Sequence, residues 1–421
     1  MLAVVRALLN LFRKPPAAEA VLKASSPAEG QPTGGLLVIE TILQAEVETD
    51  ATLKAFVGDQ TKPALEKPVR LSPTAQTPWI ALHGHLLPNG PAKVRLELVG
   101  RGGAVLAERT LTLKVRNEGE LARQVAESLR ASGVPLVVDG ACDSRMYDYG
   151  DPTLTAWFDR EPAAVETHLA ELAASGKATP DEIEALRHFV ENGYLVVEDL
   201  IAPDHLKRLN AALDDAVEKK VEGYEWGSSQ RLHNLHLQYP AIRELWLHPK
   251  VMRLLGLIFG EPARPCQSLT YVFGSQQEHH QDTVHLTPFP AGRMCGVWTA
   301  LEDVQPDSGE LIVFPKSHKL PRVYMSSVGL SKVGEDWGPF QQKVVSYWTD
   351  LIVQNRLGRE VYRPKAGTVL IWHENLMHAG SPRKDLSKSR RSIVGHYFAQ
   401  GSVVYYDSSG LPGVLYEGPL A

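Results

Sequence analysis

The chain has 421 residues, of which 43% are hydrophobic and 22% charged, and a formal net charge of −5. This length exceeds what one hydrophobic core usually serves, so we expect two or three domains of an ordinary soluble protein. The charge balance excludes the basic footprint of a nucleic-acid-binding protein, and three widely spaced cysteines exclude a disulfide framework or a cysteine zinc site. Such cysteine usage is typical of a reducing, cytoplasmic location.

The first 35 residues combine a short apolar segment with a linker. Residues 1–14 are helix-patterned, but Arg6 interrupts them and the run is too short to span a membrane. We favour a packed helix over one that contacts a membrane surface. Residues 15–35 are rich in Pro, Ala, Ser and Gly, which predicts a flexible linker.

Residues 36–116 are expected to form a small domain of their own. Apolar or alternating segments, separated by turns such as Asn89-Gly90, predict short strands at residues 36–42, 78–82, 93–99 and 110–115. Their number and spacing indicate a β-sandwich of immunoglobulin-like type. No catalytic constellation lies there, and the pattern leaves open whether the domain binds a partner protein, a glycan or nothing.

Residues 117–178 are expected to bridge the two domains through helical and extended segments. At Thr179-Pro180-Asp-Glu182 a capping box with proline at the first helical position predicts a firm helix start. Further helices are expected from Pro203 and over residues 249–259, where Gly260 ends the pattern. Together with the strands predicted around the motifs described next, these helices indicate that residues 179–421 form a mainly β domain with helices.

The most informative motif is His280-Gln-Asp282, which His378 follows after a short apolar strand at residues 368–372. Two imidazoles and one carboxylate are the ligand set of mononuclear non-haem Fe(II) oxygenases, and they leave open positions for a co-substrate and O2. On a β-strand the one-residue spacing would point His280 and Asp282 to the same face. His373 is the alternative distal ligand.

A carboxylate-binding residue follows the distal histidine. Arg390 opens a predicted strand, and an inward guanidinium could pair bidentately with a carboxylate. Tyr271, on the strand before His280, is a candidate wall of the same pocket.

Sequence motifs spread over roughly residues 180–400 resemble those of the phytanoyl-CoA dioxygenase family. The motifs that carry the resemblance are His280-Gln-Asp282, Trp298-Thr-Ala-Leu-Glu-Asp303, Ser308-Gly309 to Ser317-His318, His378 and Arg390. The resemblance implies a C-terminal double-stranded β-helix of jelly-roll or cupin type with backing helices. It also implies Fe(II) as cofactor and 2-oxoglutarate as co-substrate.

The resemblance also assigns roles by position. It implies that His280, Asp282 and His378 bind iron. It implies that Arg390 pairs with the far carboxylate of 2-oxoglutarate, while Gln281 and Trp298 line the same pocket. Because related halogenases have a small residue in place of Asp282, the carboxylate favours hydroxylation.

The substrate side is less defined. The polar and aromatic segment 226–239 is either a solvated loop or a substrate-contacting loop in which Arg231 or His233 binds an anionic or polar group. His285 could reach the same cavity. We expect a small or medium-sized organic substrate, and no basic cluster suits the diphosphate of coenzyme A.

The predicted function is therefore Fe(II)- and 2-oxoglutarate-dependent hydroxylation with release of succinate and CO2. A zinc hydrolase that uses the same triad is one alternative, but it would need a general base and no Arg390 clamp. A catalytically silent scaffold that acts through its N-terminal sandwich is the other.

Overall fold

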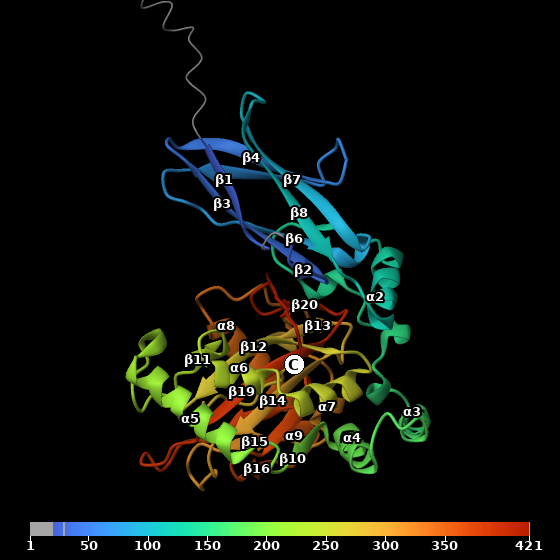
Figure 1. Ribbon diagram of the computed structural model, residues 1–421, viewed down its shortest axis with the longest axis vertical. Coiled ribbons are helices and arrows are strands. Elements are labelled where there is room, and N and C mark those ends of the chain that lie inside the picture. The colour runs from blue at the N-terminus through green and yellow to red at the C-terminus, as the bar shows by residue number, and fades with distance from the viewer. Residues whose placement is uncertain (1–19, 28–29, 421) are drawn as a thin grey trace, which may run out of the picture. The chain divides into compact units, whose positions relative to one another are not determined.

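The computed structural model describes residues 20–27 and 30–420, which divide into two units (Figure 1). Unit 1 comprises the described residues up to Asn117 together with Pro135–Gly140, and unit 2 comprises Glu118–Val134 and the residues from Ala141 onward. The packed helix predicted for residues 1–14, like the alternative of membrane contact, concerns residues outside the described ranges. Within the described ranges no helix is long and apolar enough to cross a membrane. The domain boundaries expected at residues 35, 116 and 178 stay predictions.

Unit 1 consists of two sheets, with strand orders β1-β3-β6-β9 and β2-β8-β7-β4-β5. The strands are β1 (Ala20–Ser26), β2 (Pro32–Thr33), β3 (Leu36–Ala45), β4 (Thr49–Val57), β5 (Leu65–Leu71), β6 (Trp79–His83), β7 (Gly90–Gly100), β8 (Val105–Val115) and β9 (Val137–Val138). Alternate residues of both sheets, such as Ile39 and Leu96, share one core and are fully buried. Strands β3, β6, β7 and β8 confirm the predicted segments. The immunoglobulin-like type stays a prediction.

One predicted linker segment is in fact a strand. Residues 20–26, whose composition predicted flexibility, form β1 and pair antiparallel with β3. The reason is alternation: Leu22 is buried, and Ala20 and Ala24 pack against the same core. Alanine, which is also common in flexible linkers, provides part of this apolar face.

Unit 2 is mainly β with helices, as the sequence predicted. A six-stranded sheet has the order β10-β17-β14-β19-β12-β11, and smaller sheets have the orders β16-β15-β18 and β13-β20-β21. The strands are β10 (Tyr194–Val197), β11 (Leu232–His233), β12 (Ala263–Tyr271), β13 (Thr287–Phe289), β14 (Met294–Ala300), β15 (Leu311–Val313), β16 (Glu360–Tyr362), β17 (Val369–His373), β18 (His378–Gly380), β19 (Ser392–Ala399), β20 (Val403–Tyr406) and β21 (Leu411–Pro412). Side chains of the six-stranded sheet and of β15 share one buried cluster, which includes Trp298 and Leu311.

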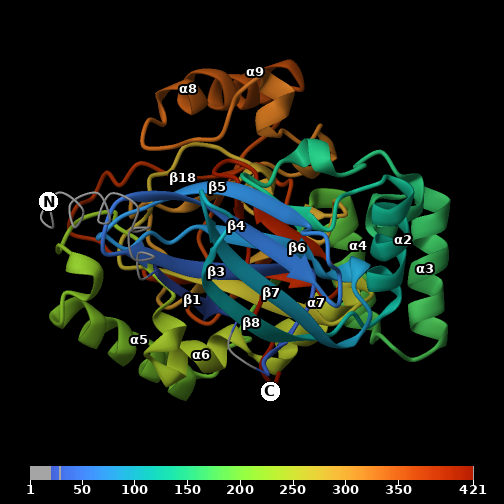
Figure 2. The same cartoon turned by 90° about the horizontal axis from the view of Figure 1, so that it is seen from above.

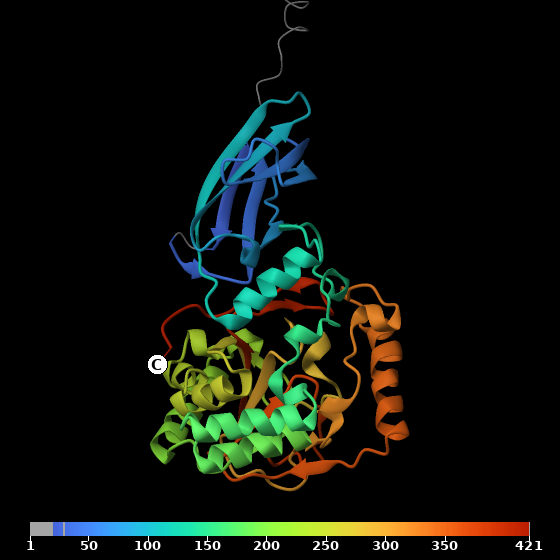
Figure 3. The same ribbon diagram turned by 90° about the vertical axis from the view of Figure 1, so that its right-hand side faces the viewer.

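Helices surround these sheets. Their bounds are α2 (Glu120–Ala131), α3 (Pro162–Ala174), α4 (Pro180–Asn192), α5 (Pro203–Glu218), α6 (Pro240–Trp246), α7 (Pro249–Phe259), α8 (Gly338–Phe340) and α9 (Ser346–Gln354). The capping box of Thr179 and Glu182 is present at the start of α4, and Gly260 ends α7 in a left-handed conformation. Helices α3 and α4 lie side by side (green in Figure 3), whereas α8 and α9 lie on the opposite margin of the unit from α5 and α6 (Figure 2).

A long insertion joins two neighbouring strands. β15 and β16 pair antiparallel, a connection that a two-residue turn could make, yet residues 314–359 lie between them. This insertion carries α8 and α9, and its Phe340 and Trp348 pack in a cluster with Ile312 of β15. It therefore adds a second apolar layer outside the smaller sheet.

An ion cluster around the buried Glu374 links the insertion to the end of β17. Arg322 lies 2.8 Å from Glu374, which is fully buried, and 2.8 Å from Asp159. Glu374 also accepts hydrogen bonds from the backbone N–H groups of Gly292 and Met294. Although burial alone would raise the pKa of Asp159, its attraction to His373 and Arg322 lowers that pKa below its usual value.

Replacing Arg322 should destabilise unit 2. In Arg322→Leu the buried Glu374 and the partly exposed Asp159 lose their shared cation, and we expect the free energy of unfolding to fall by about 3 kcal/mol. Because Asp159 has a depressed folded pKa, its contribution is present at neutral pH and is lost as the pH falls below about 4. Thermal unfolding followed by circular dichroism at pH 7 and at about pH 2 measures both effects. The control is Lys365→Leu, which breaks an exposed pair with Asp303 and should leave the midpoint nearly unchanged.

Candidate metal centre

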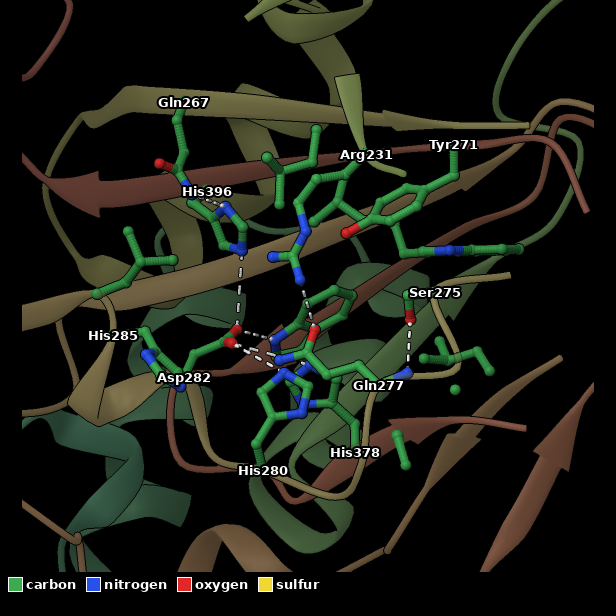
Figure 4. Close-up of a pocket in the computed structure, with 18 of the residues that line it drawn as sticks. Arg231, Gln267, Tyr271, Ser275, Gln277, His280, Asp282, His285, His378 and His396 are labelled. Atoms are coloured by element: carbon green, nitrogen blue, oxygen red, sulfur yellow. Dashed lines mark hydrogen bonds and ion pairs between the residues drawn. The ribbon is translucent and has the colours of Figure 1, made fainter. Parts of the chain in front are cut away.

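Three of the predicted site residues converge in unit 2. Ligand atoms of His280, Asp282 and His378 all lie within 4.8 Å of one another, and all three side chains are buried. Asp282 Oδ1 is 3.7 Å from His280 Nε2 and 3.8 Å from His378 Nε2. Figure 4 shows both imidazoles on one side of the carboxylate. The arrangement offers two nitrogens and one oxygen to a single ion, as the motif predicted.

The local backbone differs from the prediction. His280 and Asp282 do not lie on a regular strand: His280 forms an isolated bridge with His378, and Asp282 begins a 3-10 turn that ends at Val284. The bridge consists of two backbone hydrogen bonds of 2.9 and 3.0 Å. The Asp282 carbonyl then accepts from the N–H of both His285 and Leu286, which turns the chain away. Convergence therefore comes from the bridge and the turn rather than from strand alternation.

Backbone carbonyls set the tautomer of both imidazoles. His280 Nδ1 donates to the carbonyl of Glu278 at 2.8 Å, and His378 Nδ1 donates to that of Leu376 at 3.0 Å. Since a carbonyl only accepts, Nδ1 carries the proton in each neutral ring and the lone pair lies on Nε2. Both lone pairs belong to the atoms that face Asp282, which is the arrangement a metal requires.

Electrostatics supports the same protonation states. Burial holds the pKa of His280 well below its usual value, so this ring is neutral at physiological pH. Burial would raise the pKa of Asp282, but its attraction to His378, His396 and His280 outweighs that effect and lowers the pKa to about 2. Neutral imidazole and ionised carboxylate are the forms that bind metal.

The triad opens into a cavity of about 280 Å³ floored by the six-stranded sheet (Figure 4). Cross-strand rows of this sheet supply the floor, because residues at the same register point to one face. One row contains Gln267, His396 and Trp372, and the next contains Leu269, Val394 and Trp298.

One end of the cavity suits an anion. Arg390 is 3% exposed, donates to the Gly309 carbonyl and to Ser392 Oγ, and forms no ion pair with any described carboxylate. Its guanidinium lies 5.5 Å from the ring centroid of Tyr271 and 5.6 Å from that of Trp298. Burial lowers its pKa to about 10, so it stays charged. The buried Trp298 Nε1 has no hydrogen-bond partner among the described residues. A carboxylate fits this donor set, because it would neutralise the arginine.

Away from Arg390, the cavity adjoins a second hollow. Arg231, His285 and Trp337 line both the inner cavity and a neighbouring hollow that the insertion helps to wall. The Arg231 guanidinium is half-buried and donates to Gln277 Oε1 over 3.5 Å. Burial lowers the pKa of His285 to about 4, so this ring is neutral.

Two predicted site residues lie elsewhere. Gln281 does not line the cavity: its Oε1 accepts from Trp348 Nε1 at 2.9 Å and its amide donates toward the carbonyl of Asn375. Because its neighbours His280 and Asp282 face the cavity, Gln281 faces the insertion. His233 is exposed and pairs with Glu222, so it is no part of the cavity wall.

Two residues near Asp282 had no role assigned from the sequence, although His396 was expected on a strand beside the co-substrate pocket. Trp372 donates from Nε1 to Asp282 Oδ2 at 2.8 Å, and His396 Nε2 lies 3.8 Å from the same oxygen. Strand alternation with Leu370 and Val394 would have placed both on the floor. His373, the alternative distal ligand, points to the opposite face, where its Nδ1 accepts from the Asn375 N–H.

Comparisons with known proteins agree with this site. The family model described as "Phytanoyl-CoA dioxygenase (PhyH)" matches residues 189–392. The peroxisomal phytanoyl-CoA dioxygenase of Rattus norvegicus is 22% identical over 255 residues, which cover 51% of this chain and 68% of the relative. Phytanoyl-CoA dioxygenase domain-containing protein 1 of Danio rerio is 28% identical over 184 residues, which cover 35% of this chain and 61% of the relative.

Among solved structures, the non-haem α-ketoglutarate-dependent carbocyclase SnoK from nogalamycin biosynthesis is 21% identical with a TM-score of 0.47. This match covers 58% of this chain and 96% of that one. Residues 189–392 thus match the phytanoyl-CoA dioxygenase family, and this match together with the relatives supports a 2-oxoglutarate-dependent dioxygenase.

Proposed function

We propose that this dioxygenase hydroxylates a small or medium-sized organic molecule, with Fe(II) held by His280, Asp282 and His378. One observation carries the proposal: a triad with its lone pairs directed inward shares a cavity with Arg390, a buried cation that has no carboxylate partner among the described residues. When bound, iron and 2-oxoglutarate supply the oxidation, in which O2 is consumed, 2-oxoglutarate yields succinate and CO2, and a substrate C–H bond becomes C–OH.

The protein's own part is binding and orientation. Arg390 would pair with the far carboxylate of 2-oxoglutarate, which offsets the cost of burying both charges. Trp298 Nε1 supplies a further donor, and Tyr271 forms the wall beside it. Leu269 and Val394 exclude water between this anion site and the triad.

The double-stranded β-helix is part of the proposal for unit 2. Its support is the common core of the six-stranded sheet and β15, with the triad at one end of these strands. For unit 1 the two sheets around a single core support the immunoglobulin-like sandwich. A partner or glycan for that sandwich stays a prediction.

Arg231 and His285 are the proposed substrate contacts. Apart from the triad, the two arginines and the other histidines, the polar lining is uncharged and includes Gln267, Ser275, Gln277, Tyr406, Ser408 and Ser409. A neutral or singly anionic substrate suits such a lining. The several charges of a coenzyme A thioester do not, because Arg231 is the cation that this side of the described cavity offers.

Metal and co-substrate binding can be observed without knowledge of the substrate. Anaerobic addition of Fe(II) and 2-oxoglutarate should produce a visible charge-transfer band, and Asp282→Ala should abolish it because the triad loses its anionic ligand. Under air the unaltered protein should release succinate slowly. Zn²⁺-dependent hydrolysis without O2 uptake would instead support a hydrolase, and failure to bind metal would support a scaffold.

Arg390 should control the affinity for the co-substrate. Arg390→Gln removes a buried charge-assisted pair, and we expect a loss of about 2–3 kcal/mol, or about a hundredfold in the Kd for 2-oxoglutarate. Calorimetry on the Mn(II)-loaded protein measures this constant. The matched control is Arg391→Gln, whose guanidinium pairs with Asp214 away from the cavity and whose loss should leave the Kd unchanged. Equal losses in both variants would contradict the assignment.

Arg231 should behave differently from Arg390. If it serves the substrate, Arg231→Gln should change the Kd for 2-oxoglutarate by no more than about threefold in the same assay. A loss as large as that of Arg390→Gln would instead show that both arginines hold the co-substrate.

A further inference from the structure

The floor of the cavity contains one row of residues that surrounds the outer oxygen of Asp282. In the six-stranded sheet Trp372 of β17 pairs with Gly296 of β14, Gly296 pairs with His396 of β19, and His396 pairs with Gln267 of β12. Residues in register across neighbouring strands point to the same face. The row Trp372-Gly296-His396-Gln267 therefore lies together beneath the triad.

We propose that this row is a carboxylate cradle that holds Asp282 as a one-oxygen ligand, an inference that rests on the proposed metal role of the triad. The two oxygens of Asp282 have different surroundings. Oδ1 faces the Nε2 atoms of His280 and His378, whereas Oδ2 accepts from Trp372 Nε1 at 2.8 Å and faces His396 Nε2. A hydrogen bond to Oδ2 restrains rotation of the carboxylate and directs Oδ1 at the ion.

Gly296 leaves the space that the cradle needs. A Cβ at this position would overlap the Trp372 indole, at Cε2, Cζ2 and Nε1. The indole can therefore lie flat over Gly296 and direct its N–H to Asp282 only because the middle residue of the row has no side chain. Any larger residue would displace the donor.

A chain of hydrogen bonds sets the tautomer of His396. Tyr406 donates its hydroxyl to Gln267 Oε1 at 3.3 Å, which orients the amide so that Gln267 Nε2 lies 3.2 Å from His396 Nδ1. An amide N–H donates, so Nδ1 accepts and the proton of the neutral ring is on Nε2, toward Asp282. His280 and His378 have the opposite tautomer. Histidine would thus serve as a metal ligand at two positions, whereas at the third its N–H points toward the carboxylate from 3.8 Å.

The cradle can be tested through metal binding without turnover. We expect Trp372→Phe, which removes only the indole N–H and part of the ring, to weaken Mn(II) binding 10- to 100-fold by calorimetry. Gly296→Ala should act in the same direction. In both variants the visible spectrum of the Co(II)-loaded protein should change, because the freed carboxylate can offer both oxygens. The matched control is Trp157→Phe, which removes a buried indole N–H bond to the carbonyl of Ile258.

The outcomes separate the cradle from the triad itself. If Asp282→Ala binds Mn(II) like the unaltered protein, the proposed metal site fails. If Asp282→Ala loses binding but Trp372→Phe matches Trp157→Phe in affinity and keeps the Co(II) spectrum, only the cradle fails. A weaker affinity with an unchanged Co(II) spectrum also overturns it, since that result indicates general loosening.

The role of His396 has its own measurement. Nitrogen-15 NMR of the Zn(II)-loaded protein should show the Nε2–H tautomer for His396 and the Nδ1–H tautomer for His280 and His378. An Nδ1–H tautomer at His396 would remove this residue from the cradle.

Discussion

The site depends on a single antiparallel bridge between two segments that are far apart in the sequence. The backbone N–H and C=O groups of His280 and His378 bond to each other, which brings the two imidazoles to a ring separation of 4.2 Å. The carbonyls of Glu278 and Leu376 then direct the Nε2 lone pairs toward Asp282. Geometry and protonation thus both follow from main-chain hydrogen bonds.

Two arginines of unit 2 differ in whether the described residues supply a carboxylate for their charge. Arg322 lies between Glu374 and Asp159, so its charge is neutralised within the chain. Arg390 is buried more deeply than Arg322, the described residues provide it with no carboxylate, and it faces the cavity of the triad. Burying a cation without an anion is costly, and a protein sustains that cost where a ligand supplies the missing charge. The contrast explains why one arginine joins the insertion to the sheet and the other belongs to the anion end of the cavity.

The sequence predicted the ends of helices well, because helix ends depend on residues close to one another in the chain. The capping box at Thr179 and the terminating Gly260 mark helix ends that the structure has at the same residues. Strand β1 was missed because Ala20 and Ala24 form an apolar face that composition does not reveal. Gln281 and His233 were assigned to the pocket from resemblance and position, yet their side chains have partners outside it, Trp348 and Glu222. Trp348 lies far along the chain from Gln281, and the contact of His233 with Glu222 depends on how the loop between them folds. Neither contact could be predicted from the local sequence.

The sequence by itself determined the donor types of the metal site, their order along the chain and the arginine that follows them, because a motif of two histidines, one aspartate and one arginine is chemically specific. Only the tertiary structure decided which further side chains reach Asp282. Trp372, Gly296 and His396 come from three strands whose mutual register depends on long-range backbone hydrogen bonds. A shift of one residue in any of these strands would turn its side chain to the other face. No short stretch of sequence encodes that register, so the surroundings of the carboxylate emerge only when the sheet has formed.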